Sequence, residues 1–125
     1  MNTTSNNERK ILSTIYNVEQ LNKIGNNDKK FLIEMLNSFI TIANECSEIM
    51  HSAMKKEDWL KIKTIAHKNI PSYSILGLND MVDVLKEIER DIDKEERREN
   101  AKNLIELFCQ ENKQVIAFIR KDLEE

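Results

Sequence analysis

Apolar side chains recur at intervals of three and four residues along most of this 125-residue chain, a spacing that predicts long amphipathic helices. Only two Gly and one Pro are available to interrupt the pattern. The chain is therefore expected to be all-α. The clearest apolar series is Phe31, Leu32, Met35, Phe39, Ile42, Cys46, Ile49 and Ala53.

Capping residues and apolar runs divide the chain into five expected helices. Asn17 and Asn79 stand where helices should begin, and Gly25 and Gly77 where helices should end. The charged stretch 93–100 reads as a solvated connector, and the last helix should turn Leu104, Leu107, Phe108, Val115, Phe118 and Ile119 inward. The expected fold is an antiparallel up-down four-helix bundle with a short extra N-terminal helix. The expected ranges are 18–24, 28–55, 57–76, 79–92 and 101–123.

Composition and residue patterning indicate the domain organisation and exclude some classes of function. Residues 1–10 are expected to be a flexible lead-in, and residues 11–125 a helical bundle domain. A net charge of -3 argues against nucleic-acid binding, and no apolar run is long enough to cross a membrane. Cys46 and Cys109 fit neither a disulfide framework nor a zinc ribbon, and His51 has no partner at metal-ligand spacing. A monomeric cytoplasmic protein is expected.

His67 is the candidate reactive residue. On a helix at 100° per residue, its side chain points about 140° away from the centre of the apolar face, and hence into solvent. A single histidine in a helical bundle more often has no function, so the residues around His67 decide the interpretation. The apolar face is formed by Trp59, Ile62, Ile65, Ala66, Asn69, Tyr73 and Leu76.

The helical neighbours of His67 suggest a docking surface. Leu60, Ile70 and Pro71 should form an exposed apolar patch beside the ring. Pro71 also removes the helical hydrogen bond to the carbonyl of His67, which suggests a functional kink or a clearance requirement. Charge and hydrogen-bond donors for a phosphoryl group would come from Lys63, Thr64, Lys68 and Ser74.

A family pattern lies on these same residues. Ala66-His67 followed by Gly77-Leu78 resembles the phosphorylation motif of histidine-containing phosphotransfer (HPt) domains, in which a Gly stands ten residues after the histidine. The resemblance extends over residues 17–123. The sequence departs from the pattern at Ile70 and Pro71, where the family usually has Lys and Gly, and Lys68 is a candidate substitute for that lysine.

The resemblance implies a phosphorelay intermediate. His67 would accept a phosphoryl group from an aspartate of a receiver domain, in a response regulator or a hybrid sensor kinase, and pass it to another receiver. Glu89, 22 residues after His67, would hydrogen-bond the imidazole and orient it. The chain shows no nucleotide site and is expected to bind no cofactor, since the receiver supplies Mg²⁺. Two alternatives remain: a receiver-binding module without phosphotransfer, and a purely structural bundle.

Overall fold

The computed structural model describes residues 12–124, so the expected lead-in at residues 1–10 lies outside the described part. Within the described residues the chain forms five α-helices and one 3-10 turn, and no strand. The elements are α2 (Glu19–Ile24), α3 (Lys29–Lys55), α4 (Trp59–Ile75), α5 (Asn79–Asp91), η1 (Glu95–Arg97) and α6 (Arg98–Glu124).

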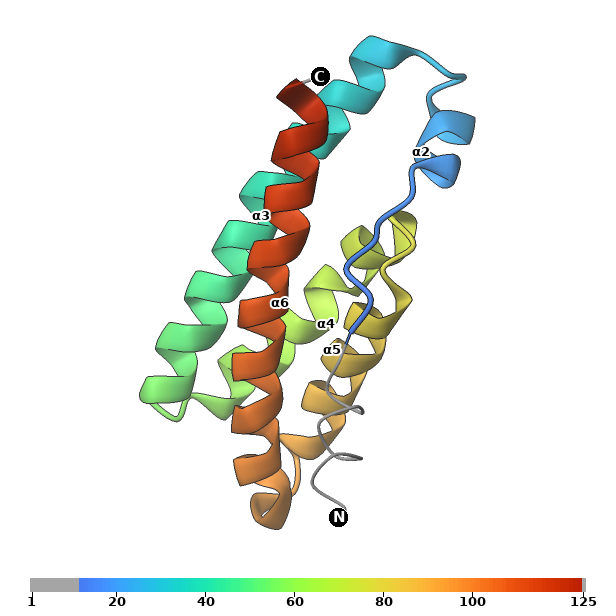
Figure 1. Cartoon of the computed structure of the whole chain (residues 1–125). Helices are drawn as coiled ribbons and strands as arrows, with labels where there is room; N and C mark the ends of the chain where they lie inside the picture. Colours follow the sequence, from blue (N-terminus) through green and yellow to red (C-terminus); the bar gives the residue numbers. More distant parts are fainter. Residues whose placement is uncertain (1–11, 125) are drawn as a thin grey trace, which may run out of the picture.

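The four long helices form the expected up-down bundle (Figure 1). Each packs on two others, in the cyclic order α3, α4, α5, α6 and back to α3, whereas α2 is short and packs on α3. The prediction of an all-α antiparallel bundle with a short extra helix is confirmed. One continuous apolar core fills the centre, and its largest fully buried side chains include Tyr73, Phe108, Met50, Ile62 and Leu85.

Short polar side chains fix the starts of α3 and α4. Asp28 accepts a hydrogen bond from the amide of Lys30, and Asp58 accepts one from the amide of Lys61. Because each aspartate satisfies an otherwise unpaired amide, α3 and α4 begin at the next residue. The expected cap at Asn79 is wrong: Asn79 is the first helical residue of α5 and follows Leu78, which makes no side-chain cap.

Gly77 ends the turn after α4 in a conformation that other residues avoid. Its φ is +69°, and a Cβ at this position would lie 2.3 Å from Nδ2 of Asn17. The amide of Asn17 also donates to the carbonyl of Leu76 at 2.8 Å. The glycine therefore lets the N-terminal segment pack closely against the α4–α5 turn.

The connector between α5 and α6 is more ordered than expected. Asp91 is buried, and its carboxylate accepts from Nδ2 of Asn100 at 2.7 Å and from the guanidinium of Arg97 at 3.4 Å. Nε of Arg98 donates to the carbonyl of Ile92. Because these contacts hold the charged stretch in place, α6 begins at Arg98, three residues before the predicted start.

Helices α3 and α6 are longer than the α4–α5 hairpin and extend past it (Figure 1). Their 27 residues span about 40 Å, against about 25 Å for the 17 residues of α4. Met35 and Phe118 lie on the overhanging parts and are 37% and 42% exposed. The prediction that Phe118 faces the core is therefore wrong, because Ile119, rotated by about 100° on α6, takes the buried position and Phe118 lines a hollow at this end of the bundle.

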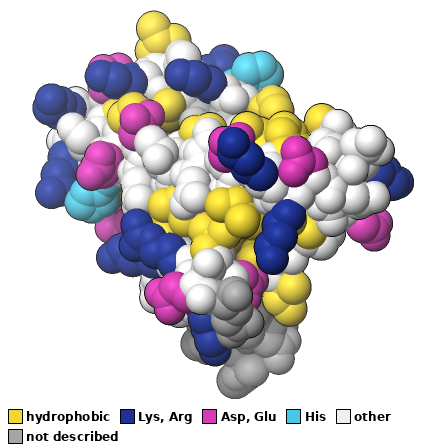
Figure 2. Space-filling view, turned by 90° about the horizontal axis from the view of Figure 1, so that it is seen from above, with side chains coloured by type: hydrophobic (Ala, Val, Ile, Leu, Met, Phe, Trp, Pro, Cys, Tyr) yellow, Lys and Arg dark blue, Asp and Glu magenta, His cyan; other side chains and the backbone are white. Residues whose placement is uncertain are grey.

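The overhang leaves a hollow of about 1010 Å³ at the α2 end of the bundle. Seen from above, this end shows a patch of hydrophobic side chains with basic and acidic side chains around it (Figure 2). The hollow is lined by the N-terminal segment, α2, α3 and α6, and no residue of α4 or α5 takes part. It therefore lies apart from the helix that carries His67.

A buried polar network joins three of the helices. The Tyr73 hydroxyl of α4 donates to Oδ1 of Asn112 in α6 at 2.5 Å. Nδ2 of Asn112 donates to the carbonyl of Ala43 and to Oγ of Ser47, both in α3. A buried polar group costs free energy unless it is paired, so these bonds favour one alignment of α4 against α3 and α6. The alignment sets the position of His67, which lies on the opposite side of α4.

Candidate functional site

His67 lies on the solvent side of α4, as the sequence predicts. Its side chain is 74% exposed, whereas Ala66 and Tyr73 on the opposite face of the same helix are fully buried. Ile62, Asn69 and Leu76 complete the buried face. The imidazole is therefore held on a rigid element and remains accessible to another macromolecule.

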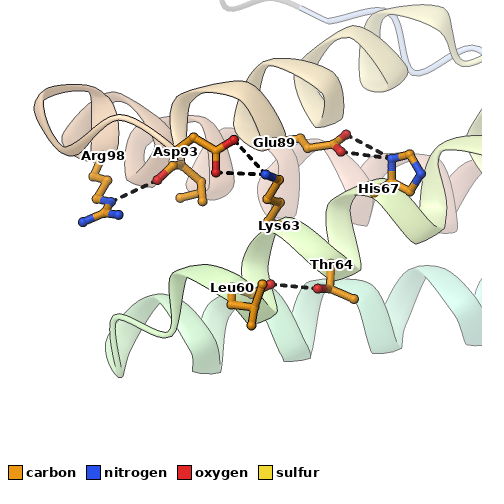
Figure 3. A network of polar contacts seen from close by, with 8 residues as sticks. Leu60, Lys63, Thr64, His67, Glu89, Asp93 and Arg98 are labelled. Atoms are coloured by element: carbon orange, nitrogen blue, oxygen red, sulfur yellow. Dashed lines mark hydrogen bonds and ion pairs between the residues drawn. The ribbon is translucent and has the colours of Figure 1, made fainter.

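Glu89 of α5 contacts the imidazole. Its two carboxylate oxygens lie 3.2 Å and 3.0 Å from Nδ1 of His67 (Figure 3). The Glu89 side chain is only 26% exposed, since it sits at the edge of the packed helix pair. A carboxylate can only accept a hydrogen bond, so Nδ1 carries the proton, and in the neutral ring Nε2 keeps the lone pair. The predicted contact between Glu89 and His67 is confirmed.

A second ion pair crosses the same helix boundary, which we call the α4–α5 seam. The ammonium of Lys63 lies 2.7 Å and 2.9 Å from the two carboxylate oxygens of Asp93 (Figure 3). Lys63 precedes His67 by one helical turn, and Asp93 follows Glu89 by one. Lys63 is an expected residue of the site, but its partner is not predicted, because Asp93 falls in the expected connector 93–100.

The apolar patch around His67 is smaller than expected. Leu60 is 74% exposed and Pro71 is exposed, but Ile70 is half-buried and packs against the core. The predicted patch of three exposed apolar side chains therefore holds for two of them. Because Ile70 packs partly against the core, it contributes only part of its surface to the patch.

The polar side chains predicted beside His67 differ in their exposure and in their hydrogen bonds. The Thr64 hydroxyl donates to the carbonyl of Leu60 at 2.9 Å, a bond internal to α4. Lys68 and Ser74 are exposed. Lys68 follows His67 directly in the helix and so points about 100° away from it. Among the described residues, none of these three side chains forms a hydrogen bond to the imidazole.

Pro71 does not end the helix. α4 runs from Trp59 to Ile75 with Pro71 inside it. Proline has no amide hydrogen, so the carbonyl of His67 lacks its usual helical donor. One turn earlier, Nδ2 of Asn69 donates to the carbonyl of Ile65 at 2.8 Å, which adds a side-chain bond to the helical ladder. The proline expected to kink the helix therefore does not interrupt α4.

The remaining findings concern metal binding, membrane crossing and the other candidate reactive residues. Among residues 12–124, no three His, Cys, Asp or Glu side chains are grouped so that they could hold a metal ion. None of the described helices combines the length and the apolar character that crossing a membrane requires. His51 is exposed on α3, and burial raises the pKa of the Cys46 thiol to about 12.

The fold is similar to that of a known phosphotransfer protein. The crystal structure of histidine-containing phosphotransfer protein B (HptB) from Pseudomonas aeruginosa PAO1 matches with a TM-score of 0.75. The match covers 88% of this chain and 95% of the HptB chain, at 20% sequence identity. No protein-family model matches the sequence, and neither does any curated protein. The resemblance to the HPt family is thus confirmed at the level of the fold.

Proposed function

We propose that this protein is a phosphorelay intermediate that carries a phosphoryl group on Nε2 of His67. One observation carries the proposal: the exposed imidazole is held through Nδ1 by Glu89, at 3.0 Å and 3.2 Å, on a rigid four-helix bundle. The similarity of the fold to HptB, a protein named for histidine phosphotransfer, supports it. Fold alone does not determine function, so the local geometry of His67 matters more.

The proposed reaction begins with a receiver domain that bears an aspartyl phosphate. The Nε2 lone pair attacks phosphorus in line, so the P–Nε2 bond forms as the P–O bond to the aspartate breaks. The carboxylate of the receiver leaves with the bonding electron pair. The imidazole gains positive charge, which the carboxylate of Glu89 offsets through the proton on Nδ1. The reverse reaction with a second receiver returns His67 to its neutral form.

The receiver is proposed to dock on the exposed face of α4. Leu60 and Pro71 offer apolar contact on either side of His67, and the accessible part of Ile70 extends that surface. Charge and hydrogen-bond donors around the docked phosphoryl group would come from Lys63, Thr64, Lys68 and Ser74. Mg²⁺ would come with the receiver, whose own groups neutralise the charge on phosphorus during transfer. We place this carrier in the cytoplasm and expect it to act as a monomer.

A second function uses the same surface without chemistry. A module that only binds and sequesters a receiver would need the patch but not the Glu89 contact. The hydrogen bond to Nδ1 favours the carrier, because a docking surface alone gives no reason to fix the tautomer of an exposed histidine.

A panel of phosphorylated receiver domains distinguishes these functions. Wild-type protein is expected to take up the phosphoryl group from at least one receiver, and His67→Gln to take up none. His51→Gln is the matched control, since His51 is also exposed but lies on α3. Receiver binding without transfer by the wild type would support the sequestering module and overturn the carrier.

A further inference from the structure

The α4–α5 seam has a regular register that extends beyond the two observed ion pairs. Lys63 pairs with Asp93, in the turn just after α5. His67, four residues further along α4, pairs with Glu89, which lies on α5 four residues before Asp93. In antiparallel helices, residues three or four apart on each helix recur on the facing sides. A further step of three residues on each helix brings Ile70 opposite Lys86.

Lys86, on α5, is the positively charged residue at this seam that could bind an added anion. Its side chain is exposed, and among residues 12–124 no carboxylate lies within ion-pair distance of it. Lys63 differs, because both oxygens of Asp93 hold its ammonium. Lys68 differs as well, since its position on α4 is rotated away from the seam. Lys86 precedes Glu89 by three residues, which is about 4.5 Å along the helix axis.

The orientation of the imidazole directs the phosphoryl group towards this lysine. Nδ1 faces Glu89, so Nε2 is on the part of the ring turned away from that carboxylate (Figure 3). The ammonium of Lys63 lies on the other side of Glu89, next to Asp93 (Figure 3). A phosphoryl group on Nε2 therefore projects away from Lys63 and towards the part of the seam formed by Ile70 and Lys86.

We propose that Lys86 of α5 binds the oxygens of the phosphoryl group on His67. This inference rests on the proposed phosphorylation of His67 and names a residue of that site. A phosphoryl group adds a charge of about −2 beside the carboxylate of Glu89, so a cation at this place lowers the electrostatic cost of the loaded state. Lys86 is a flexible donor and can follow the group as it arrives and leaves.

The test uses chemical phosphorylation, so it needs no receiver. Phosphoramidate donates its phosphoryl group to Nε2: its P–N bond breaks, ammonia leaves, and the P–Nε2 bond forms. A ³¹P NMR titration of the loaded protein then gives the pKa of the phosphoryl group. A neighbouring ammonium lowers that pKa, so Lys86→Gln should raise it by about 0.3–0.7 units, the size of an exposed charge interaction. Lys86→Arg should restore most of the wild-type value.

Matched variants separate this contact from a general effect of charge. Lys113→Gln also removes one exposed positive charge, but Lys113 lies on α6, which packs on α3 and α5 rather than on α4. It should leave the titration within 0.1 units, a bound set by the expected Lys86 shift. Equal titrations for Lys86→Gln and wild type would overturn the inference. A clear Lys86 shift in a protein that exchanges no phosphoryl group with any receiver would instead refute the proposed function and leave the contact standing.

Discussion

Removal of the Glu89 carboxylate should slow phosphoryl transfer without stopping it. The carboxylate contacts Nδ1 of His67 at 3.0 Å and 3.2 Å, and a hydrogen bond to a charged group contributes about 1.5–3 kcal/mol. The ring is 74% exposed, so water competes for Nδ1 and reduces the loss to about 0.7–2 kcal/mol. Glu89→Ala is therefore expected to lower the transfer rate roughly 3- to 30-fold.

Single-turnover transfer from a phosphorylated receiver, measured by rapid quenching, gives this rate directly. Glu87→Ala is the control, because Glu87 lies on α5 only two residues away and faces another direction. Glu89→Gln keeps a hydrogen-bond acceptor but loses the charge, so its rate should fall between the wild type and Glu89→Ala. Each variant should retain native helicity, since alanine and glutamine favour helix.

The tautomer of His67 provides a second readout. The wild-type ring at neutral charge should show one form, protonated at Nδ1, in ¹⁵N NMR spectra, and Glu89→Ala should show a mixture. Equal transfer rates for wild type and Glu89→Ala, together with a mixture in the wild type, would refute the orienting role. His67 would then be the remaining reactive residue of the site.

Three further predictions concern the bundle and its surface. Asn112→Ala should lower the free energy of unfolding by about 2–3 kcal/mol in urea denaturation, because the buried Tyr73 hydroxyl loses its acceptor; an unchanged midpoint would contradict this. Cys46, whose pKa burial raises to about 12, should resist iodoacetamide at pH 9 until the protein unfolds. For the same reason, the free energy of unfolding should fall as pH rises from about 8.5 towards 12, because the unfolded thiol ionises first. Ile70→Asp should weaken receiver binding about 5- to 30-fold by calorimetry, with Leu60→Asp as the variant that spares the core; unchanged affinity in both would place the docking face elsewhere.

The sequence predicts the helices well because their causes are local. Asp28 and Asp58 cap helices through their own side chains, and Gly77 is placed where a positive φ is required. Periodicity also places His67 on the exposed face of α4. The start of α6 was missed, because Asp91 holds the connector through residues six and nine positions away, and such contacts leave no periodic signal.

Contacts between helices are harder to predict from one sequence. The buried network around Asn112 depends on how α6 faces α3 and α4, and a polar residue in a helix more often lies on the surface. Phe118 fits the apolar spacing of α6, but Ile119 takes the buried position beside it and Phe118 lines the hollow at the α2 end. The Glu89 contact came from the family resemblance. The Lys63–Asp93 pair required the three-dimensional register.

The chemical identity of the phosphorylated group tests the central claim most directly. Wild-type protein, loaded by a phosphorylated receiver, should show a single ³¹P resonance of a phosphoramidate on Nε2 of His67. The label should be lost in acid and retained in base, and mass spectrometry should locate it in the peptide that contains His67. A label retained in acid, or one that persists on well-folded His67→Gln protein, would contradict the account.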